Sequence, residues 1–248
     1  MKPLNKLPTE EQIPRNTCAS RRFAWCESCG KDELIVMQQQ RQCQHIVAPG
    51  EYIFMEGDTP DSTFTLQEGW AICFKLLANG QRQILYVALA GDFIGYRNNT
   101  GETIDFSVMA MTSCRLCSFS QANIDTLLTI SNKLTHRLIS IQLQQAQTCR
   151  NRLSYVGQSQ EILRFAYFLM EIINRLEKRG ANISKPIKFP LSRVEIADAI
   201  GVTSVYLSRV SVELREEKIM DSRHNRLNVL NLEKLKQLAD SVFQEPAE

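Results

Sequence analysis

The sequence lacks the long apolar runs that membrane-spanning proteins need. No stretch approaches the roughly 18 consecutive apolar residues of a spanning helix, and the first residues, MKPLNKLPTEEQIPRN, have no apolar signal-peptide core. An excess of charge of one sign is also lacking, because the formal net charge of the 248 residues is only +2. We therefore expect a cytoplasmic protein with no membrane partner, whose overall charge identifies no other partner.

Catalytic patterns are scarce as well. Histidine occurs only at positions 45, 136 and 224, and residues 46–120 contain none. A metal enzyme of the cupin type needs several imidazoles that converge inside a β-barrel, so the sequence disfavours that class. It contains neither a phosphate-binding P-loop nor a Gly-x-Ser-x-Gly nucleophile elbow. We expect a protein that is not an enzyme.

Short β-type runs dominate the first half of the chain. Residues 1–30 predict an irregular tail, because three prolines interrupt it. Residues 31–130 contain EYIFMEGD, STFTLQEG, WAICFKLL and QILYVALAGDFIG, which are punctuated by glycine and predict a β-roll or jelly roll. Asn79 and Gly80 lie between two of these runs and predict a hairpin, because a tight primed turn needs the positive φ that both residues tolerate.

A long helix is predicted next, at residues 131–158. Its apolar side chains form two stripes, Leu134, Leu138 and Ile141 in one and Ile139, Leu143, Ala146 and Leu153 in the other. Two stripes imply two buried surfaces. We expect one stripe to lie on the β-roll and the other to meet a second copy of the chain. The alternative is a helix that packs only within its own domain.

Residues 159–248 carry a helix-turn-helix pattern. Ser192 is in position to cap a short helix, Gly201 to make the tight turn, and Thr203 to cap a second helix over about residues 204–216. The following SRHNRLNVLN predicts a two-stranded wing with arginines near its tip, at positions 223 and 226. The predicted fold class is therefore α+β, with a β-roll, a long dimerisation helix and a C-terminal winged helix-turn-helix.

The second helix of such a motif enters the DNA major groove, and its N-terminal turns face the base edges. The outward positions here are Ser204, Val205, Ser208 and Arg209. Arg209 is the strongest candidate for base contact, because a guanidinium can donate two hydrogen bonds to guanine O6 and N7. The alternative is a surface ion pair with Glu213, one turn on. Backbone amides and the side chains of Arg193, Thr203, Arg223 and Arg226 are the expected phosphate contacts.

The stretch GVTSVYLSRVSVELREEKIM resembles the recognition helix of the CRP/FNR superfamily of bacterial transcription factors. GEYIFMEGD and AGDFIGY resemble the superfamily's cyclic-nucleotide-binding-like β-roll, so the resemblance covers nearly the whole chain. It implies a homodimer that binds a pseudo-palindromic promoter site and contacts RNA polymerase. It places the serine and arginine that read DNA in the FNR branch at Ser208 and Arg209. Val205 departs from the glutamate of much of the family, which suggests contact with a thymine methyl in place of cytosine.

The resemblance offers cyclic AMP as one effector. In the CRP branch a Gly-Glu pair and, some ten residues on, an Arg-Ser pair hold its phosphate. Here Gly91 and Asp92 occupy the first position, but the second region reads GETIDFSVM, with Asp105 and Phe106 and no arginine. Two acids without a cation would repel a phosphate. We therefore expect no binding of cyclic AMP; a cyclic-nucleotide- or other small-effector-responsive regulator remains the alternative.

An iron-sulfur cluster is the second option, since oxygen-sensing FNR proteins bind one through three N-terminal cysteines and a fourth in the β-roll. Cys117 matches the fourth position, and Cys18, Cys26 and Cys29 could supply the others, because four thiolates suffice. Their spacing departs from the family. A zinc clip, a dithiol switch and no sensing role therefore stay open. We interpret the remaining four as small buried hydrophobic residues: Cys43, Cys73, Cys114 and Cys149.

A different class of function is a non-catalytic interaction module built on a winged helix. The balanced charge is compatible with that class. The salt dependence of DNA affinity separates such a module from a DNA-binding regulator, because the affinity of a regulator for DNA weakens as salt suppresses counterion release.

Overall fold

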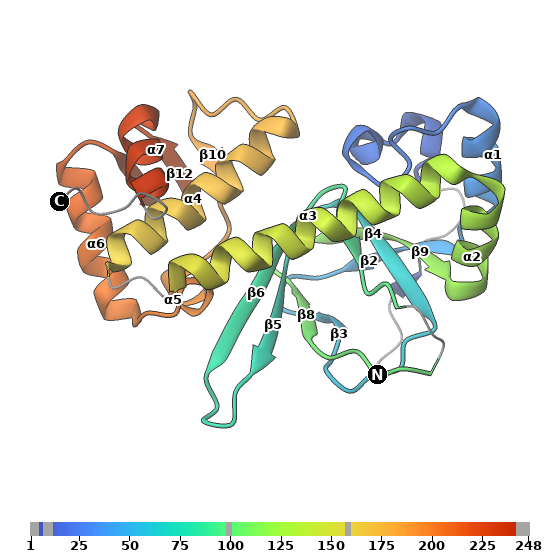
Figure 1. The fold of residues 1–248 in the computed structure, drawn as a ribbon, viewed down its shortest axis with the longest axis horizontal. Coiled ribbons are helices and arrows are strands. Elements are labelled where there is room, and N and C mark those ends of the chain that lie inside the picture. Colours follow the sequence, from blue (N-terminus) through green and yellow to red (C-terminus); the bar gives the residue numbers. More distant parts are fainter. Residues whose placement is uncertain (1–4, 7–11, 98–100, 157–159, 242–248) are drawn as a thin grey trace. The chain divides into compact units, whose positions relative to one another are not determined.

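The computed structural model describes residues 5–6, 12–97, 101–156 and 160–241. The chain divides into two compact units (Figure 1). One unit comprises Met1–Leu76 and Leu85–Ala146, and the other comprises Leu77–Ile84 and Gln147–Glu248. In the described residues, no helix is both long and apolar enough to cross a membrane.

The first unit contains the β-roll that the glycine-punctuated runs predicted. Two antiparallel sheets form it, one with the strand order β1-β2-β9-β4-β7 and the other with the order β3-β8-β5-β6. A shared apolar core includes Val47, Leu66 and Val108, all fully buried. The strands are β1 (Asn5–Lys6), β2 (Cys43–Val47), β3 (Tyr52–Phe54), β4 (Ser62–Glu68), β5 (Trp70–Leu76), β6 (Arg82–Leu89), β7 (Phe93–Ile94), β8 (Ser107–Ala110) and β9 (Cys114–Ser120).

The predicted hairpin at Asn79 and Gly80 joins β5 to β6. Only Gly80 has a positive φ, of 80°. Asn79 contributes through its side chain instead, because its Oδ1 accepts a hydrogen bond from the Gln81 backbone amide at 3.0 Å. The turn therefore spans more residues than a two-residue primed turn, with Leu77 and Gln81 bonded across its base at 2.8 Å.

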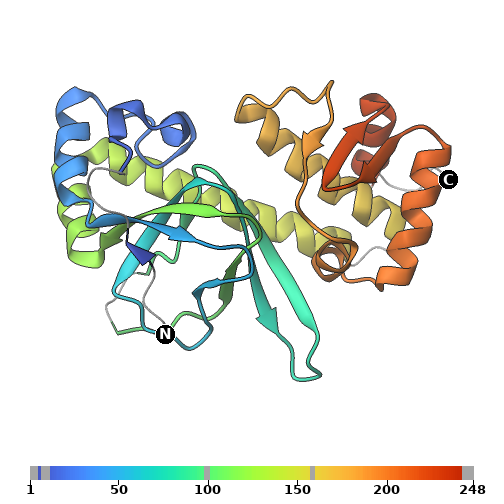
Figure 2. The same ribbon diagram turned by 180° about the vertical axis from the view of Figure 1, so that it is seen from behind.

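The N-terminal segment is irregular, as predicted, but it is packed into the first unit. It contains short 3-10 helices at Arg15–Thr17 and Ala19–Phe23 and leads into helix α1 (Lys31–Gln40). Trp25 is fully buried, and its ring centroid lies 5.0 Å from that of Phe93. Its Nε1 donates to the Leu134 carbonyl oxygen at 3.2 Å. The N-terminal segment is thereby tied to the first half of α3, beside which its ribbon runs (Figure 2).

Helix α3 (Asn132–Val156) follows α2 (Gln121–Ile130) and carries both predicted apolar stripes. The first stripe packs in the first unit, where Leu134, Leu138 and Ile141 are 1%, 5% and 9% exposed. The second stripe faces solvent along the same helix, because Ile139, Leu143 and Leu153 are 51%, 61% and 76% exposed. The helix therefore has one satisfied apolar face and one that is open in the single chain.

The second unit is a winged helix-turn-helix. Its three-stranded sheet has the order β10-β12-β11. A buried ion pair joins the end of α3 to α4, where Arg152 Nε donates to Glu171 Oε2 at 2.9 Å. The elements are α4 (Glu161–Lys178), β10 (Ile187–Lys188), α5 (Arg193–Ile200), α6 (Ser204–Glu216), β11 (Met220–Arg223), β12 (Arg226–Val229) and α7 (Leu232–Asp240).

Candidate nucleic-acid interface

Local hydrogen bonds define both helices of the motif. Ser192 and Glu195 form a capping box at the start of α5, in which the Ser192 amide donates to Glu195 Oε2 at 2.7 Å. Gly201 ends α5 in the left-handed conformation, with φ 69°, which glycine adopts at little cost. Thr203 Oγ1 then accepts from the Tyr206 amide at 3.2 Å and caps α6. The predicted helix-turn-helix is therefore confirmed, with the predicted caps.

Packing of α5 against α6 fixes which face of α6 points outward. Leu207, Val210 and Leu214 are at most 2% exposed, and they recur at the spacing of one helical face. Ala197 on α5 is 3% exposed, as expected of a small residue where the helices cross. Val202, which follows the turn glycine, is only half-buried.

Several predicted DNA-contacting residues, the expected phosphate contact Thr203 among them, lie on the opposite, outward side of α6. Val205 is 74% exposed, and Thr203, Ser204 and Arg209 are exposed as well. Ser208 is half-buried and its Oγ donates to the Ser204 carbonyl oxygen at 2.8 Å. In the free chain this hydroxyl proton is therefore used within the helix.

The guanidinium of Arg209 lies over the ring of Tyr206, with Cζ 5.5 Å from the ring centroid. Desolvation raises the pKa of Tyr206, and a hydrogen bond with Glu161 acts in the same direction. In the part of the chain that the structure describes, Arg209 makes no ion pair with Glu213. The rival interpretation of Arg209 is thus not what the structure contains.

The predicted wing is the hairpin of β11 and β12. Arg223 pairs with Arg226 in the strand register, and the two residues between them, His224 and Asn225, have φ of 51° and 59°. Two consecutive positive φ values are typical of a tight primed turn. Both arginines are exposed at the tip, and Arg223 Nε lies 3.2 Å from Asp221 Oδ1.

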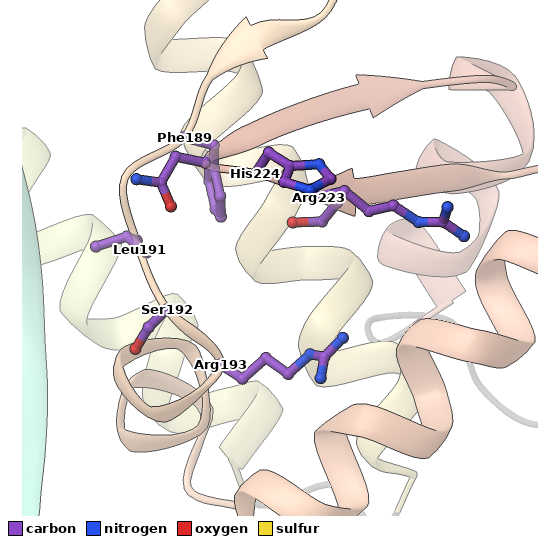
Figure 3. Close-up of a pocket in the computed structure, with 8 residues that line it drawn as sticks. Phe189, Leu191, Ser192, Arg193, Arg223 and His224 are labelled. Atoms are coloured by element: carbon purple, nitrogen blue, oxygen red, sulfur yellow. The ribbon is translucent and has the colours of Figure 1, made fainter.

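A hollow of about 390 Å³ separates the start of α5 from the tip of the wing (Figure 3). The guanidinium groups of Arg193 and Arg223 extend in the same direction at its edge (Figure 3). Ser192 and His224 also line the hollow. Sequence reasoning assigned both arginines to phosphate contact, but it gave Ser192 only a capping role and His224 no role in binding. The proximity of residues 192 and 224 follows from strand pairing, since Ile187 of β10 pairs with Leu227 of β12.

The four candidate cluster ligands are not brought together as a ligand set. Cys26, Cys29 and Cys117 are at most 4% exposed and belong to one apolar cluster with Trp25. Cys18 lies outside that cluster and accepts a hydrogen bond from Gln67 Nε2 at 3.2 Å. Among the described residues, no three His, Cys, Asp or Glu side chains form a group that could hold a metal ion. The arrangement does not fit a four-thiolate site.

The other four cysteines differ from one another. Cys73 and Cys114 are buried hydrophobic residues, as predicted, and burial raises the pKa of the Cys114 thiol. The interpretation was wrong for Cys149, which is exposed on α3, and for Cys43, which is only half-buried. Cys149 stands beside exposed Arg150 on α3, and Cys43 follows exposed Gln42 at the first position of β2.

The two carboxylates near the expected phosphate position of the β-roll interact with other side chains and amides of the same chain. Asp92 Oδ2 accepts hydrogen bonds from Tyr86 Oη and from the Leu89 amide, both at 2.7 Å. Asp105 does have a nearby cation, because Lys75 Nζ lies 3.6 Å from its Oδ2. The carboxylates therefore already have partners.

Two family models match the chain. Residues 44–131 match the cyclic nucleotide-binding domain, and residues 163–238 match the Crp-like helix-turn-helix domain. These ranges cover the β-roll with its following helix and the winged helix-turn-helix. The chain therefore contains a cyclic nucleotide-binding-type domain followed by a Crp-like helix-turn-helix domain.

Relatives match over nearly the full chain. The nitrogen fixation regulation protein FixK of Bradyrhizobium diazoefficiens is 29% identical over 223 residues, 90% of this chain and 92% of that protein. The fumarate and nitrate reduction regulatory protein of Vibrio cholerae is 20% identical over 247 residues, covering 95% and 97%. The solved structure of FixK2 from Bradyrhizobium japonicum has a TM-score of 0.71 at 20% identity, covering 83% of this chain and 98% of that one. With both domains in this order and these relatives, the chain belongs to the CRP/FNR family of non-enzymatic, DNA-binding transcription regulators.

Proposed function

We propose that the protein binds a pseudo-palindromic promoter site as a homodimer and that a signal at the β-roll or its N-terminal cysteines controls this binding. The observation that carries the proposal is the outward face of α6, on which Arg209 and Val205 are exposed beside a capped N-terminus. RNA polymerase is the expected protein partner at the promoter. The cytoplasm is the expected location.

Each exposed residue has a proposed role in the complex. Arg209 donates to guanine O6 and N7, and Ser208 contacts the adjacent base after its hydroxyl leaves the Ser204 carbonyl. Ser204 and Val205 complete the base-reading turn, with Val205 against a thymine methyl. Phosphates bind to the groups that border this turn, namely the side chains of Arg193, Thr203, Arg223 and Arg226.

Dimer formation is supported by the open apolar stripe of α3. Ile139, Leu143 and Leu153 lie on one side of the helix and expose more than half of their surface in the single chain. Burial in a parallel pair of helices removes this apolar surface from water. We expect Leu143→Glu to convert the protein to a monomer in light scattering coupled to gel filtration. Gln142→Glu adds the same charge at the neighbouring exposed position and should leave the dimer intact; a dimeric Leu143→Glu would contradict this interface.

A route for the signal is supported by the packing of Trp25. It is buried between Phe93 and Phe119 and donates to the Leu134 carbonyl of α3, so a change in the N-terminal segment reaches the proposed dimer helix directly. The present positions of Cys18, Cys26, Cys29 and Cys117 do not favour a shared cluster. An anaerobic absorption spectrum of the freshly purified protein tests that alternative, because iron-thiolate charge transfer gives a broad visible band that bleaches in air.

The decisive test of DNA binding is the Arg209→Ala variant. A preferred duplex is first selected from a randomised pool with the wild-type protein, and affinities are then measured by fluorescence anisotropy at two salt concentrations. Loss of a bidentate base contact costs about 1–3 kcal/mol, roughly fivefold to 150-fold in affinity, and relaxes specificity at one base pair. Lys236→Ala removes an exposed cation of α7 and serves as the matched control. Equal affinities for Arg209→Ala and wild type would overturn the proposal.

A further inference from the structure

Three polar side chains meet on one face of the larger β-roll sheet. Cys43 and His45 are two residues apart on β2 and therefore point to the same face. Ser118 lies on β9, directly opposite Cys43 in the register. The Cys43 Sγ atom is 3.1 Å from His45 Nε2 and 3.2 Å from Ser118 Oγ, and the last two atoms are 3.1 Å apart.

The imidazole is held firmly in this triangle. His45 is only 6% exposed, and its ring meets the ring of Phe64 edge-on, with 5.6 Å between centroids and 85° between planes. Ser118 is 1% exposed, and its hydroxyl is also within 3.2 Å of the Cys43 carbonyl oxygen, to which it can donate. A thiol within hydrogen-bond reach of an imidazole nitrogen is the pairing found in thiol-based active sites.

Cys43 differs from the thiols of the core because it keeps partial contact with solvent. It is half-buried, whereas Cys73, Cys114 and Cys117 are at most 6% exposed. Of the three residues in this triangle, Cys43 is therefore the one that meets solvent. Exposure alone does not activate a thiol, however, since the thiolate is the reactive form. The imidazole of His45 lies next to the thiol and can take its proton, which generates the thiolate.

We propose that Cys43 is a thiol-modification site that His45 activates toward low-molecular-weight disulfides. Nε2 of His45 takes the proton of the Cys43 thiol, and the resulting thiolate attacks one sulfur of the disulfide. The S–S bond of the reagent breaks as a new S–S bond forms to Cys43. The leaving thiolate receives the proton back from His45. Cys43 is oxidised, the reagent is reduced by the same two electrons, and no further oxidant is needed.

Cys149 and Cys18 are the internal comparisons for this inference. Cys149 lies on α3 and is more exposed than Cys43. Cys18 is half-buried like Cys43, but its hydrogen-bond partners are Ser20 and Gln67, and neither side chain is a base. If access alone decided reactivity, Cys149 would react first. If the imidazole decides it, Cys43 reacts first.

The test uses the full-length folded protein and oxidised glutathione at one fixed pH. Samples are quenched with acid at intervals, free thiols are alkylated, and the mixed disulfide at each cysteine is quantified by mass spectrometry. We expect Cys43 to form the adduct about tenfold faster than Cys149 or more, because a positioned base contributes at least this much. We expect His45→Gln to remove that advantage and to leave the rate of Cys149 unchanged.

Two further measurements keep the inference testable if the His45→Gln variant does not fold: the Ser118→Ala variant and the comparison of cysteines within the wild-type protein. Ser118→Ala should slow Cys43 by a smaller factor than His45→Gln, because the Ser118 hydroxyl accepts a hydrogen bond from the protonated Nε2 and does not itself take the proton. If His45→Gln does not fold, the wild-type ratio of Cys43 to Cys149 still decides the matter. A wild-type Cys43 that reacts no faster than Cys149, or a folded His45→Gln variant with an unchanged Cys43 rate, would overturn the inference. Neither readout depends on DNA binding, so failure here leaves the proposed function untouched.

Discussion

Helix α6 and the cysteine-bearing segment (residues 18–29) differ in how far their candidate functional side chains are exposed to solvent. On α6, Arg209 is exposed and Val205 is 74% exposed. In the cysteine-bearing segment, Cys26 and Cys29 are 1% and 4% exposed, and Trp25 beside them is fully buried. A side chain that binds a partner must reach solvent, whereas a buried thiol contributes packing like any small apolar group. This difference matches the roles that we propose, with α6 as the DNA-contacting helix and this segment as part of the core.

The strongest way to break this comparison is to remove Trp25. We expect Trp25→Ala to lower the free energy of unfolding by about 3–5 kcal/mol, because it deletes a large buried ring and leaves a cavity. The loss is measured by urea unfolding of the full chain, followed by circular dichroism. Ile35→Ala, at a position of α1 that is 58% exposed, should change stability by less than about 0.5 kcal/mol. A Trp25→Ala variant as stable as Ile35→Ala would mean that the segment is not part of the core.

Substitution of Val205 sharpens the other side of the comparison. We expect Val205→Glu to move the preference at one base pair from A·T toward C·G, where the carboxylate accepts from cytosine N4, by about 1–3 kcal/mol. Folding should not suffer, because a carboxylate in the first turn of α6 interacts favourably with the helix dipole. The measurement is a binding-site selection with each protein.

Val212→Glu is the matched control for Val205→Glu. It makes the same change on the same helix, at a position that is 39% exposed and lies two turns further on. We expect its selected sites to equal those of the wild type. Identical selected sites for Val205→Glu would show that this turn of α6 does not face bases.

The smallest expected effect is that of Cys117→Ala. Cys117 is fully buried beside Phe119, so the loss of its sulfur should lower the free energy of unfolding by about 1 kcal/mol. Because we assign the residue to packing, DNA affinity should stay at the wild-type value with and without oxygen. Cys149→Ala, at the exposed cysteine, should alter neither quantity. An oxygen-dependent affinity in the wild type that Cys117→Ala abolishes would restore a ligand role for this thiol.

Local features of the sequence predicted the DNA-binding half well. The bounds of α5 and α6 follow from Ser192, Gly201 and Thr203, because caps and turns depend on residues a few positions apart. The β-roll also follows, from its short runs and glycines. The exact shape of the Asn79 hairpin does not, since a side chain there replaces part of the expected backbone turn.

Features that depend on distant contacts could not be read from the sequence. His45 and Cys43 meet Ser118 only because β2 pairs with β9, and residues 43 and 118 are 75 positions apart. Likewise, nothing near Trp25 indicates that it bonds to Leu134, 109 positions on. The cysteine-bearing segment was therefore harder to predict than α6, because its environment is assembled by tertiary packing.

The turn of the wing has a consequence for affinity. Arg223 and Arg226 are paired in the strand register across only two residues, His224 and Asn225. The backbones of the two arginines are therefore held at a fixed spacing before any ligand binds. The conformational entropy of the turn is lost when the protein folds and not when it associates with a ligand. A ligand with two anionic groups at the matching separation would meet both cations at once, whereas a longer or glycine-rich turn would have to be ordered by the ligand itself.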